Sequence, residues 1–425
     1  MDMAKPKIRF KGYTDDWEQR KLGDMMDVTS VKRIRQSDWT DSGVRFLRAR
    51  DIVAESKNEE VSEPLFISQE KYDEYSAVSG KVEKGDLLVT GVGTIGVPML
   101  INSEEPLYFK DGNIIWFKNK NAIDGRFFYH SFNGLNIQKF IKESAGTGTV
   151  GTYTIENGKK TPINLPLRKE EQEKIGEYFS NLDHLITLHQ RKCEETKKLK
   201  KYMLQKMFPQ NGQKVPEIRF SGFTDAWEQR KLEDIMDTVT DYVAAGSFED
   251  IRNNVTYLNE PGYAQLVRTV DLKKKFTNND SIYVDESAFK YLWRVNLNEE
   301  CIVLPNIGAN IGEVYFVEPS GLPYDNNVLG PNAILLKANE DTYFAFTALN
   351  NLTFQKQLFE NVGSSGQPKF NKTELKSIQL YMPQNEEQEK IGQYFRDLDH
   401  LITLHQHKCE QLQSMKKFML QNMFV

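Results

Sequence analysis

Apolar residues recur at alternating steps of four and three along two long stretches of this chain. Such heptad spacing is typical of a helix that packs against another helix. The first stretch begins near Glu170 and ends near Phe208, and the second begins near Glu386. Because both carry the same apolar seam, we expect the two helices to pair. The seam residues are Ile175, Phe179, Leu182, Ile186 and His189 in the first helix and Ile391, Phe395, Leu398, Ile402 and His405 in the second.

The second helix repeats the first almost residue for residue. Of the 23 aligned positions in residues 172–194 and 388–410, 19 are identical. The opening segment, residues 6–27, likewise returns at residues 216–237. An internal repeat of this kind decides the architecture before any single motif does. It predicts two halves, each with an opening segment, a variable region and a long helix.

Short β-like runs separated by Gly, Asn and Asp lie between the repeated segments and predict strands. Helical spacing follows them in both halves, at residues 122–143 and 342–360. The shared order predicts two mixed α/β regions and an α+β fold class for the chain. The predicted strands are residues 44–47, 86–90, 98–101 and 113–117 in the first half and 301–304, 314–317 and 333–336 in the second.

The repeat also sets the expected domain boundaries. Proline at the end of each variable region marks the exit from an extended segment before each long helix starts. The expected order is a first domain at 1–166 with its opening segment at 6–27, a helix at 167–209, a linker at 210–217, a second domain at 218–383 and a second helix at 384–425.

Composition excludes several broad classes. Apolar residues make up 39% of the chain and aromatic residues 11%, enough for ordinary folded cores. No apolar run is long enough for a membrane span, and the first ten residues lack the apolar core of a signal peptide. We therefore expect a cytoplasmic protein. The net charge of −5 argues against a general nucleic-acid coat protein but leaves open a specific reader with clustered basic residues.

Catalytic and metal-binding patterns are weak. Two GxGxxG strings, at residues 91–96 and 146–151, lack the strand-before and helix-after context of a dinucleotide fold, so a turn or a backbone close to DNA fits them better. No GxxxxGK[ST] phosphate loop occurs, and no Asn/Asp-Pro-Pro-aromatic motif of an amino-methyltransferase. The helical histidines are spaced five apart, which does not place metal ligands on one face. We expect His189 and His405 to fix helix register, no metal site, and no catalysis by this chain.

Basic and polar side chains in the variable regions are the candidates for DNA contact. Arg and Lys neutralise phosphates, whereas Arg, Asn, Gln and Ser can also read base edges. Solvated surface charge is the alternative for each basic residue. Arg48 and Arg268 precede Asp51 and Asp271 by three residues, so an internal ion pair that shapes a loop is a second alternative for them. The candidates are Lys32, Arg33, Arg35, Arg48, Arg50, Thr147, Thr149 and Lys159 in the first half and Arg252, Arg268, Lys273, Lys274, Ser364, Ser365, Gln367 and Lys369 in the second.

Several motifs together resemble the specificity subunit of a Type I restriction–modification system. They are WEQRKLGD and WEQRKLED from Trp17 and Trp227, the R-x-x-D-[IL] strings, the GVGTIG turn, and the EEQEKIGxYFxxLDxLI helices from Glu170 and Glu386. The resemblance implies two target-recognition domains separated by an antiparallel coiled coil of the two long helices, with a pseudo-two-fold internal repeat. Each domain would read one half of a bipartite, asymmetric DNA site, and the helix pair would set the spacer.

The resemblance also implies partners and cofactors. The partners would be double-stranded DNA, two methyltransferase subunits and two restriction/motor subunits, with no membrane. S-adenosylmethionine, ATP and Mg would belong to the partner subunits and none to this chain, which would be a non-catalytic part of an adenine-N6 methyltransferase and ATP-dependent endonuclease. The alternative is a coiled-coil protein-interaction scaffold without DNA specificity; a stand-alone nuclease or methyltransferase is disfavoured by the missing motifs.

Overall fold

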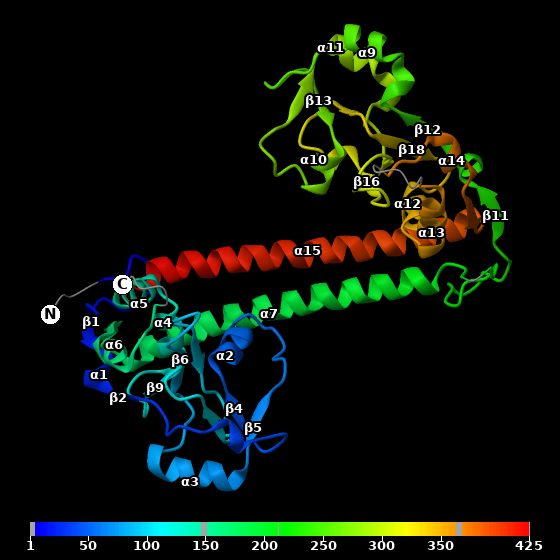
Figure 1. Cartoon of the computed structure of the whole chain (residues 1–425). Coiled ribbons are helices and arrows are strands. Elements are labelled where there is room, and N and C mark those ends of the chain that lie inside the picture. The colour runs from blue at the N-terminus through cyan, green and yellow to red at the C-terminus, as the bar shows by residue number, and fades with distance from the viewer. Residues whose placement is uncertain (1–4, 146–150, 211, 363–367, 425) are drawn as a thin grey trace. The chain divides into compact units, whose positions relative to one another are not determined.

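The computed structural model describes residues 5–145, 151–210, 212–362 and 368–424. The chain divides into two compact units (Figure 1). Unit 1 comprises Met1–Gln190 and Gln406–Val425, and unit 2 comprises Arg191–His405. Both long helices cross the boundary, so each unit combines one variable region with one end of each helix. The segment boundaries expected from the sequence stay a prediction.

The two long helices are α7 (Lys169–Lys206) and α15 (Asn385–Met423). Both open with two glutamates in the first turn, where a negative charge complements the helix dipole. Within unit 1 the helices run antiparallel, because Asp183 pairs with Lys416 while Phe179, one turn earlier, meets Phe424. In unit 2 Lys200 pairs with Asp399 and Phe208 meets Phe395, which is the same antiparallel arrangement.

Among its described residues, unit 1 contains two four-stranded sheets and one two-stranded sheet. One four-stranded sheet is antiparallel throughout, and the other has a parallel pair between its last two strands. The first has the order β2 (Asp27–Thr29), β9 (Ile114–Lys118), β6 (Leu87–Thr90), β7 (Pro98–Leu100), the second β3 (Trp39–Thr40), β5 (Leu65–Ile67), β4 (Val44–Leu47), β8 (Leu107–Phe109), and the small sheet pairs β1 (Glu18–Lys21) with β10 (Pro162–Leu165).

The shorter helices of unit 1 cover these sheets and join them to the long helices. Trp17, Phe117 and Phe127 share a core with Phe179 of α7 and Met423 of α15. A second core lies around Phe46, Tyr108 and Trp116, between the four-stranded sheets. The helices are α1 (Leu22–Met25), η1 (Gln36–Asp38), α2 (Ala49–Ser56), α3 (Gln69–Ser79), α4 (Gly125–Phe132), α5 (Leu135–Ser144) and α6 (Ile155–Lys160).

Unit 2 repeats this plan with a smaller second sheet. Its sheets are β12 (Met236–Asp241), β18 (Ala333–Ala338), β15 (Cys301–Pro305), β16 (Tyr315–Val317); then β14 (Ile282–Val284), β13 (Ala264–Val267), β17 (Asn327–Leu329); and the pair β11 (Glu228–Lys231), β19 (Gln379–Met382). Its helices are α8 (Leu232–Ile235), η2 (Tyr242–Ala245), α9 (Phe248–Asn254), α10 (Thr269–Lys273), α11 (Glu286–Tyr291), η3 (Trp293–Val295), η4 (Pro319–Gly321), α12 (Thr342–Leu349), α13 (Leu352–Asn361) and α14 (Lys372–Ser377).

The mixed α/β prediction is therefore confirmed, with one correction in each half. The expected helix at residues 342–360 is two helices, α12 and α13, because the Asn351 side chain accepts a hydrogen bond from the Thr353 N–H and starts a new helix. The helical stretch at residues 122–143 is likewise divided into α4 and α5, with Gly134 at the N-cap of α5. Apolar periodicity continues across both breaks, so it does not reveal them.

In each unit, one buried ion pair joins the opening segment to the long helix that follows it. In unit 1, Arg9 donates through Nε to Glu171 Oε1 at 2.6 Å and through Nη2 to Oε2 at 2.8 Å. In unit 2, Arg219 makes the same fork on Glu387, with both distances 2.7 Å. The two glutamates are at most 1% exposed. The arginine of the opening segment and the glutamate of the helix are thus repeated together because they form the same ion pair in both units.

A helical glycine allows the close approach of each long helix to its unit. A Cβ at Gly176 would lie 2.6 Å from Asp124 Oδ1 and 2.7 Å from the Phe127 N–H group, at the start of α4. A Cβ at Gly392 would clash with Asp341 in the same way, at the start of α12. Both aspartates are N-caps of the short helices. The glycine is therefore repeated because only hydrogen fits there.

In the described parts of the chain, no helix is both long and apolar enough to cross a membrane.

Candidate functional site

An exposed basic loop in unit 1 rests on aromatic side chains. Val31 and Ile34 are buried and anchor the segment that carries Lys32, Arg33 and Arg35. Lys32 Nζ lies 4.4 Å from the centre of the Tyr75 ring, a cation–π contact that orients the ammonium group. The three candidate side chains thus point outward from a fixed loop, as a phosphate-binding segment requires.

Basic residues of α3, of the segment that follows it and of β9 extend this group. Lys71 also lies over the Tyr75 ring, and Lys81 lies over the Tyr72 ring. Lys118 of β9 stacks on Trp116 at 4.2 Å. Sequence reasoning missed these lysines. The spacing of Lys71 and Tyr75, four residues apart in a helix, was the available signal.

Arg48 and Arg268 are held by internal ion pairs. Arg48 Nη2 donates to Asp51 Oδ1 at 3.0 Å and to the Glu63 carbonyl at 2.8 Å. Arg268 Nη2 donates to Asp271 Oδ1 at 2.7 Å and to the Asp280 carbonyl at 2.8 Å. Asp271 is fully buried, and its hydrogen bonds raise the pKa of Arg268 further above its usual value. The structure supports the loop-shaping alternative for both arginines, while contact with DNA stays untested.

The remaining candidates of unit 1 are less concentrated. Arg50 is half exposed, 3.6 Å from Glu63 and 3.8 Å from Asp51. Lys159 lies on α6, where it pairs with Glu156 at 3.3 Å. These contacts are typical of surface charge, so neither residue is distinguished by its surroundings.

In unit 2 the candidate lysines lie at the C-terminal end of α10, where Lys273 is the last helical residue and Lys274 the C-cap. Both are exposed, and Lys273 Nζ contacts Asn310 Oδ1 at 2.8 Å and Glu313 Oε1 at 2.5 Å. Arg252, on α9, and Lys369, beside the turn at residues 306–312, are also exposed. The structure thus distributes these residues over several elements.

Exposed aromatic residues mark unit 2 more clearly than its lysines do. Trp293 is 61% exposed and has the Arg294 guanidinium 4.6 Å from its ring centre. Phe248, at the start of α9, is 80% exposed. Aromatic faces with adjacent arginines suit contact with nucleic acid or protein. Neither aromatic residue is marked by a motif or by its spacing in the sequence.

Five predicted contact residues fall outside the described residues: Thr147, Thr149, Ser364, Ser365 and Gln367.

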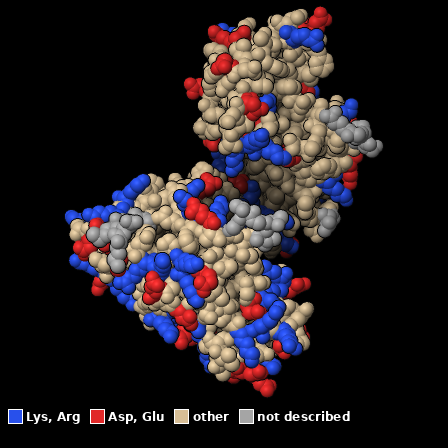
Figure 2. Space-filling model, turned by 60° about the vertical axis from the view of Figure 1, so that its left-hand side comes forward, with Lys and Arg blue, Asp and Glu red and all other residues tan. Residues whose placement is uncertain are grey.

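The face shown in Figure 2 mixes both signs of charge: Lys and Arg side chains lie in groups with Asp and Glu side chains between them. No single sign covers a whole face there. Recognition would therefore depend on local clusters such as the Lys32 loop.

The GVGTIG turn is structural. It leads from β6 into β7, and Gly96 has a φ of +76°, the left-handed region that favours glycine. A Cβ there would lie 3.0 Å from Ile141 of α5. Gly312 occupies the corresponding turn in unit 2, with φ +92° against Phe359 of α13. The helix that a dinucleotide loop requires does not follow either turn.

The predicted seam is buried at one end of each helix and half-buried further along. Ile175, Phe179, Leu182 and Ile186 are buried in unit 1, and Ile391, Phe395 and Leu398 are buried in unit 2. His189, Ile402 and His405 are half-buried. The register role of the two histidines stays a prediction. In the described residues no cluster of three or more His, Cys, Asp or Glu side chains is arranged to hold a metal ion.

A second apolar stripe on the long helices faces solvent. It is repeated at the offset of 216 residues, and its six side chains are between 40 and 55% exposed. In unit 1 it consists of Leu185, Met415 and Phe418, and in unit 2 of Leu199, Tyr202 and Leu401. Because Asp183 pairs with Lys416, Leu185 and Met415 lie at the same level of the antiparallel helices. The seam pattern did not reveal this stripe.

Residues 14–198 and 224–414 both match the Type I restriction modification DNA specificity domain. Together the two matches span most of the chain and coincide with its two halves. The chain belongs to this family.

Relatives support the assignment over different lengths. A putative Type I restriction enzyme specificity subunit from Haemophilus influenzae is 30% identical over 171 residues, which is 39% of this chain and 41% of that protein. A putative MjaX specificity subunit from Methanocaldococcus jannaschii is 22% identical over 420 residues, 95% of this chain and 91% of that protein. The crystal structure of the Type I restriction–modification S subunit from M. genitalium matches the structure of this chain with a TM-score of 0.62. The two sequences are 16% identical, and the match covers 99% of both chains. The fold of the family therefore extends over the full chain.

Proposed function

We propose that this family member is the non-catalytic specificity subunit of a Type I restriction–modification complex, and that each unit reads one half of a bipartite, asymmetric DNA site. The observation that carries the proposal is the contrast between a repeated scaffold and diverged surfaces. The pairs Arg9–Glu171 and Arg219–Glu387 repeat, as do Gly176 and Gly392.

The surfaces presented on this scaffold differ in kind. Unit 1 exposes the Lys32 loop backed by Tyr75, whereas unit 2 exposes Trp293 with Arg294 and the lysines at the C-terminal end of α10. Two different surfaces on equivalent supports favour two different half-sites. Basic residues would supply phosphate contacts, and base contacts would supply the sequence preference.

The long helices would have two tasks. As an antiparallel pair they would set the length of DNA left unread between the half-sites, as dimer spacing does in other DNA readers. The exposed stripe would dock two identical methyltransferase subunits, one at Leu185, Met415 and Phe418 and the other at Leu199, Tyr202 and Leu401. A repeated apolar surface within one chain suits two copies of one partner.

The chemistry of the complex would reside in the partners. Methyltransferase subunits would use S-adenosylmethionine to methylate adenine, and restriction/motor subunits would use ATP and Mg. This chain would recognise the DNA sequence at which the partners act, and the complex would work in the cytoplasm. Much of the phosphate contact would come from the partners, which accommodates its net charge of −5.

A region exchange tests the reading of half-sites. Residues 28–166 are replaced by the corresponding region of another family member, and methylated adenines are mapped across the genome of a host carrying the complex. We expect one half of the recognised site to change and the other half to persist. A change in both halves, or in neither, contradicts the modular reading.

A helix insertion tests the spacer. Adding about one helical turn near Thr196, with a compensating turn in α15, is expected to alter the spacer length and leave both half-sites unchanged. An unchanged spacer would contradict the proposal that the helix pair sets the length of DNA between the half-sites.

The docking surface has its own test. Leu185→Glu with Phe418→Glu in unit 1, and Leu401→Glu with Tyr202→Glu in unit 2, should each remove one methyltransferase subunit from the complex by native mass spectrometry. Glu177→Lys, an exposed change on α7 outside the stripe, is the control. The alternative, a protein-interaction scaffold without DNA specificity, predicts no sequence-specific DNA shift even with both methyltransferase subunits bound.

A further inference from the structure

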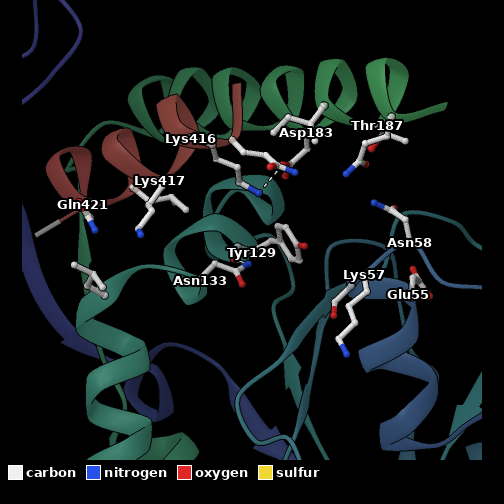
Figure 3. Close-up of a pocket in the computed structure, with 16 residues that line it drawn as sticks. Glu55, Lys57, Asn58, Tyr129, Asn133, Asp183, Thr187, Lys416, Lys417 and Gln421 are labelled. Atoms are coloured by element: carbon white, nitrogen blue, oxygen red, sulfur yellow. Dashed lines mark hydrogen bonds and ion pairs between the residues drawn. The ribbon is translucent and has the colours of Figure 1, made fainter. Parts of the chain in front are cut away.

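A cleft in unit 1 lies where the end of α2 faces α4 and the two long helices (Figure 3). Its volume is about 690 Å³, and an adjoining hollow of about 440 Å³ shares Glu55, Asn58, Tyr129 and Asp183 with it. The cleft is built from segments far apart in the sequence. In α15, Lys417 and Gln421 face the cleft. Lys417 is next in sequence to the stripe residue Phe418 and lies about 100° from it around the helix, whereas Gln421, three residues after Phe418, lies at the border between the cleft and the stripe.

Five side-chain amides and five charged side chains form most of the polar lining. An amide both donates and accepts hydrogen bonds, so these amides can pair with the N–H and C=O groups of a polypeptide backbone. Apolar side chains lie between them, including Tyr129, Ile186 and Leu420. The amides are Asn58, Asn133, Gln190, Gln413 and Gln421.

The charges of the cleft leave an excess of positive charge. Asp183 is already paired with Lys416 at 2.5 Å. Lys57 and Lys417 also line the cleft, and neither has an ion-pair partner in the described parts of the chain. Glu55 is the remaining acid, and burial raises the pKa of its carboxyl group. An acidic side chain from a ligand would therefore be attracted to the lysine side of the cleft.

Nucleic acid fits this lining poorly. A duplex presents a broad convex surface rather than the narrow chain that a cleft between helices can accept. A polypeptide satisfies the amides, the apolar side chains and the lysines together.

Unit 2 fills the corresponding position with a large side chain. Ser180, which lines the adjoining hollow, corresponds to Arg396 at the repeat offset. Arg396 Nη2 pairs with Glu300 at 2.9 Å, and its guanidinium lies 4.8 Å from the Tyr343 ring centre and 5.3 Å from that of Phe316. The small Ser180 leaves this space open in unit 1.

We propose that the unit 1 cleft binds an acidic, partly apolar polypeptide segment of a partner protein. The site goes beyond DNA reading and is separate from the apolar stripe. It also makes the two units unequal, since a segment that binds beside Ser180 would meet Arg396 in unit 2.

The probe is a random-peptide display library selected on the full-length chain, followed by fluorescence anisotropy with the most enriched peptide. We expect enrichment of peptides that combine Asp or Glu with Leu or Phe. Lys417→Glu should weaken the selected peptide about tenfold or more, and so should Ser180→Arg. Lys417 is exposed and its replacement leaves the core intact, so it remains informative if Ser180→Arg disturbs folding beside His130.

The repeat supplies matched controls. Lys201→Glu and Arg396→Ser change the corresponding positions of unit 2 and should alter peptide affinity less than about twofold. Lack of acidic peptides after selection would overturn the proposal, and so would equal affinity for Lys417→Glu and the unchanged chain. Retained recognition of both DNA half-sites by Lys417→Glu would show that such a failure leaves the proposed function standing.

Discussion

Arg9 forms a two-pronged hydrogen bond with Glu171, joining the opening segment of the chain to a long helix that begins 160 residues later. Arg9 is 12% exposed and Glu171 1%. The hydrogen bond to Glu171 raises the pKa of Arg9 above its usual value. A buried pair of this kind is costly to break on one side, because the remaining charge loses its partner without regaining water.

Arg9→Ala should therefore destabilise unit 1 by about 3 kcal/mol. Urea unfolding combined with native-state hydrogen exchange would assign the loss to unit 1. Arg219→Ala should place the same loss in unit 2. Arg20→Ala removes an exposed pair with Glu18 and should cost less than about 0.5 kcal/mol. Equal effects of Arg9→Ala and Arg20→Ala would contradict the role of the buried pair.

Gly176→Ala should destabilise unit 1 by about 1–3 kcal/mol, because the added methyl group overlaps Asp124 and the start of α4. The result runs against helix propensity, which favours alanine over glycine by about 1 kcal/mol. Thermal unfolding of Gly176→Ala, with Glu177→Ala on the exposed face as the control, measures the difference. A stabilised Gly176→Ala chain would show that the close packing is absent.

Arg268→Gln should lower the stability of unit 2 by about 2 kcal/mol, because Asp271 would stay buried without its charged donor. If Arg268 only stabilises the fold, the variant should bind one DNA half-site less well only to the extent that unit 2 is unfolded. Comparing DNA affinity with the folded fraction at several urea concentrations separates the two effects. Loss of affinity in a fully folded variant would instead assign Arg268 to DNA contact.

His130 should make unit 1 sensitive to acid. Burial, and then the charges of Lys416 and Arg126, lower its pKa to about 3, and its ring lies 3.4 Å from Ser180 and 3.9 Å from Asp183. The unfolded chain, with a histidine pKa near 6.5, binds the proton more readily, so stability is full above about pH 6.5 and falls below it. At pH 5 the loss is about 2 kcal/mol.

The measurement is the free energy of unfolding of unit 1 between pH 7.5 and 5. In the His130→Gln variant this free energy should decrease less as the pH falls. In the His184→Gln variant, which changes the exposed side of α7, it should decrease as much as in the unchanged chain. An identical slope in the His130→Gln variant would mean that other groups carry the acid sensitivity.

Local periodicity and repetition were enough to predict the two long helices, the two mixed α/β regions and seven of their strands, but not others such as β5, β8 and β13. These features depend on neighbouring residues, whose spacing is written in the chain. The exceptions are instructive. Gly134 and Asn351 divide expected helices, because helix starts depend on capping geometry that apolar spacing does not record.

The candidate site depended much more on tertiary structure. The sequence presented Arg48 and Arg268 equally as DNA contacts or as ion pairs, and only the fold showed their guanidinium groups turned onto buried aspartates. The Lys71–Tyr75 contact, the Trp293–Arg294 surface and the exposed stripe also emerged from burial and packing.

By itself, the sequence determined that the chain is a duplicated scaffold, because identity between distant segments needs no coordinates to be seen. Tertiary structure alone decided why those segments repeat. Arg9 meets Glu171, and Gly176 meets Asp124, only when residues far apart along the chain are brought together. It also decided that Ser180 leaves a cleft where Arg396 fills one, since the same backbone position has different space around it once its neighbours are folded.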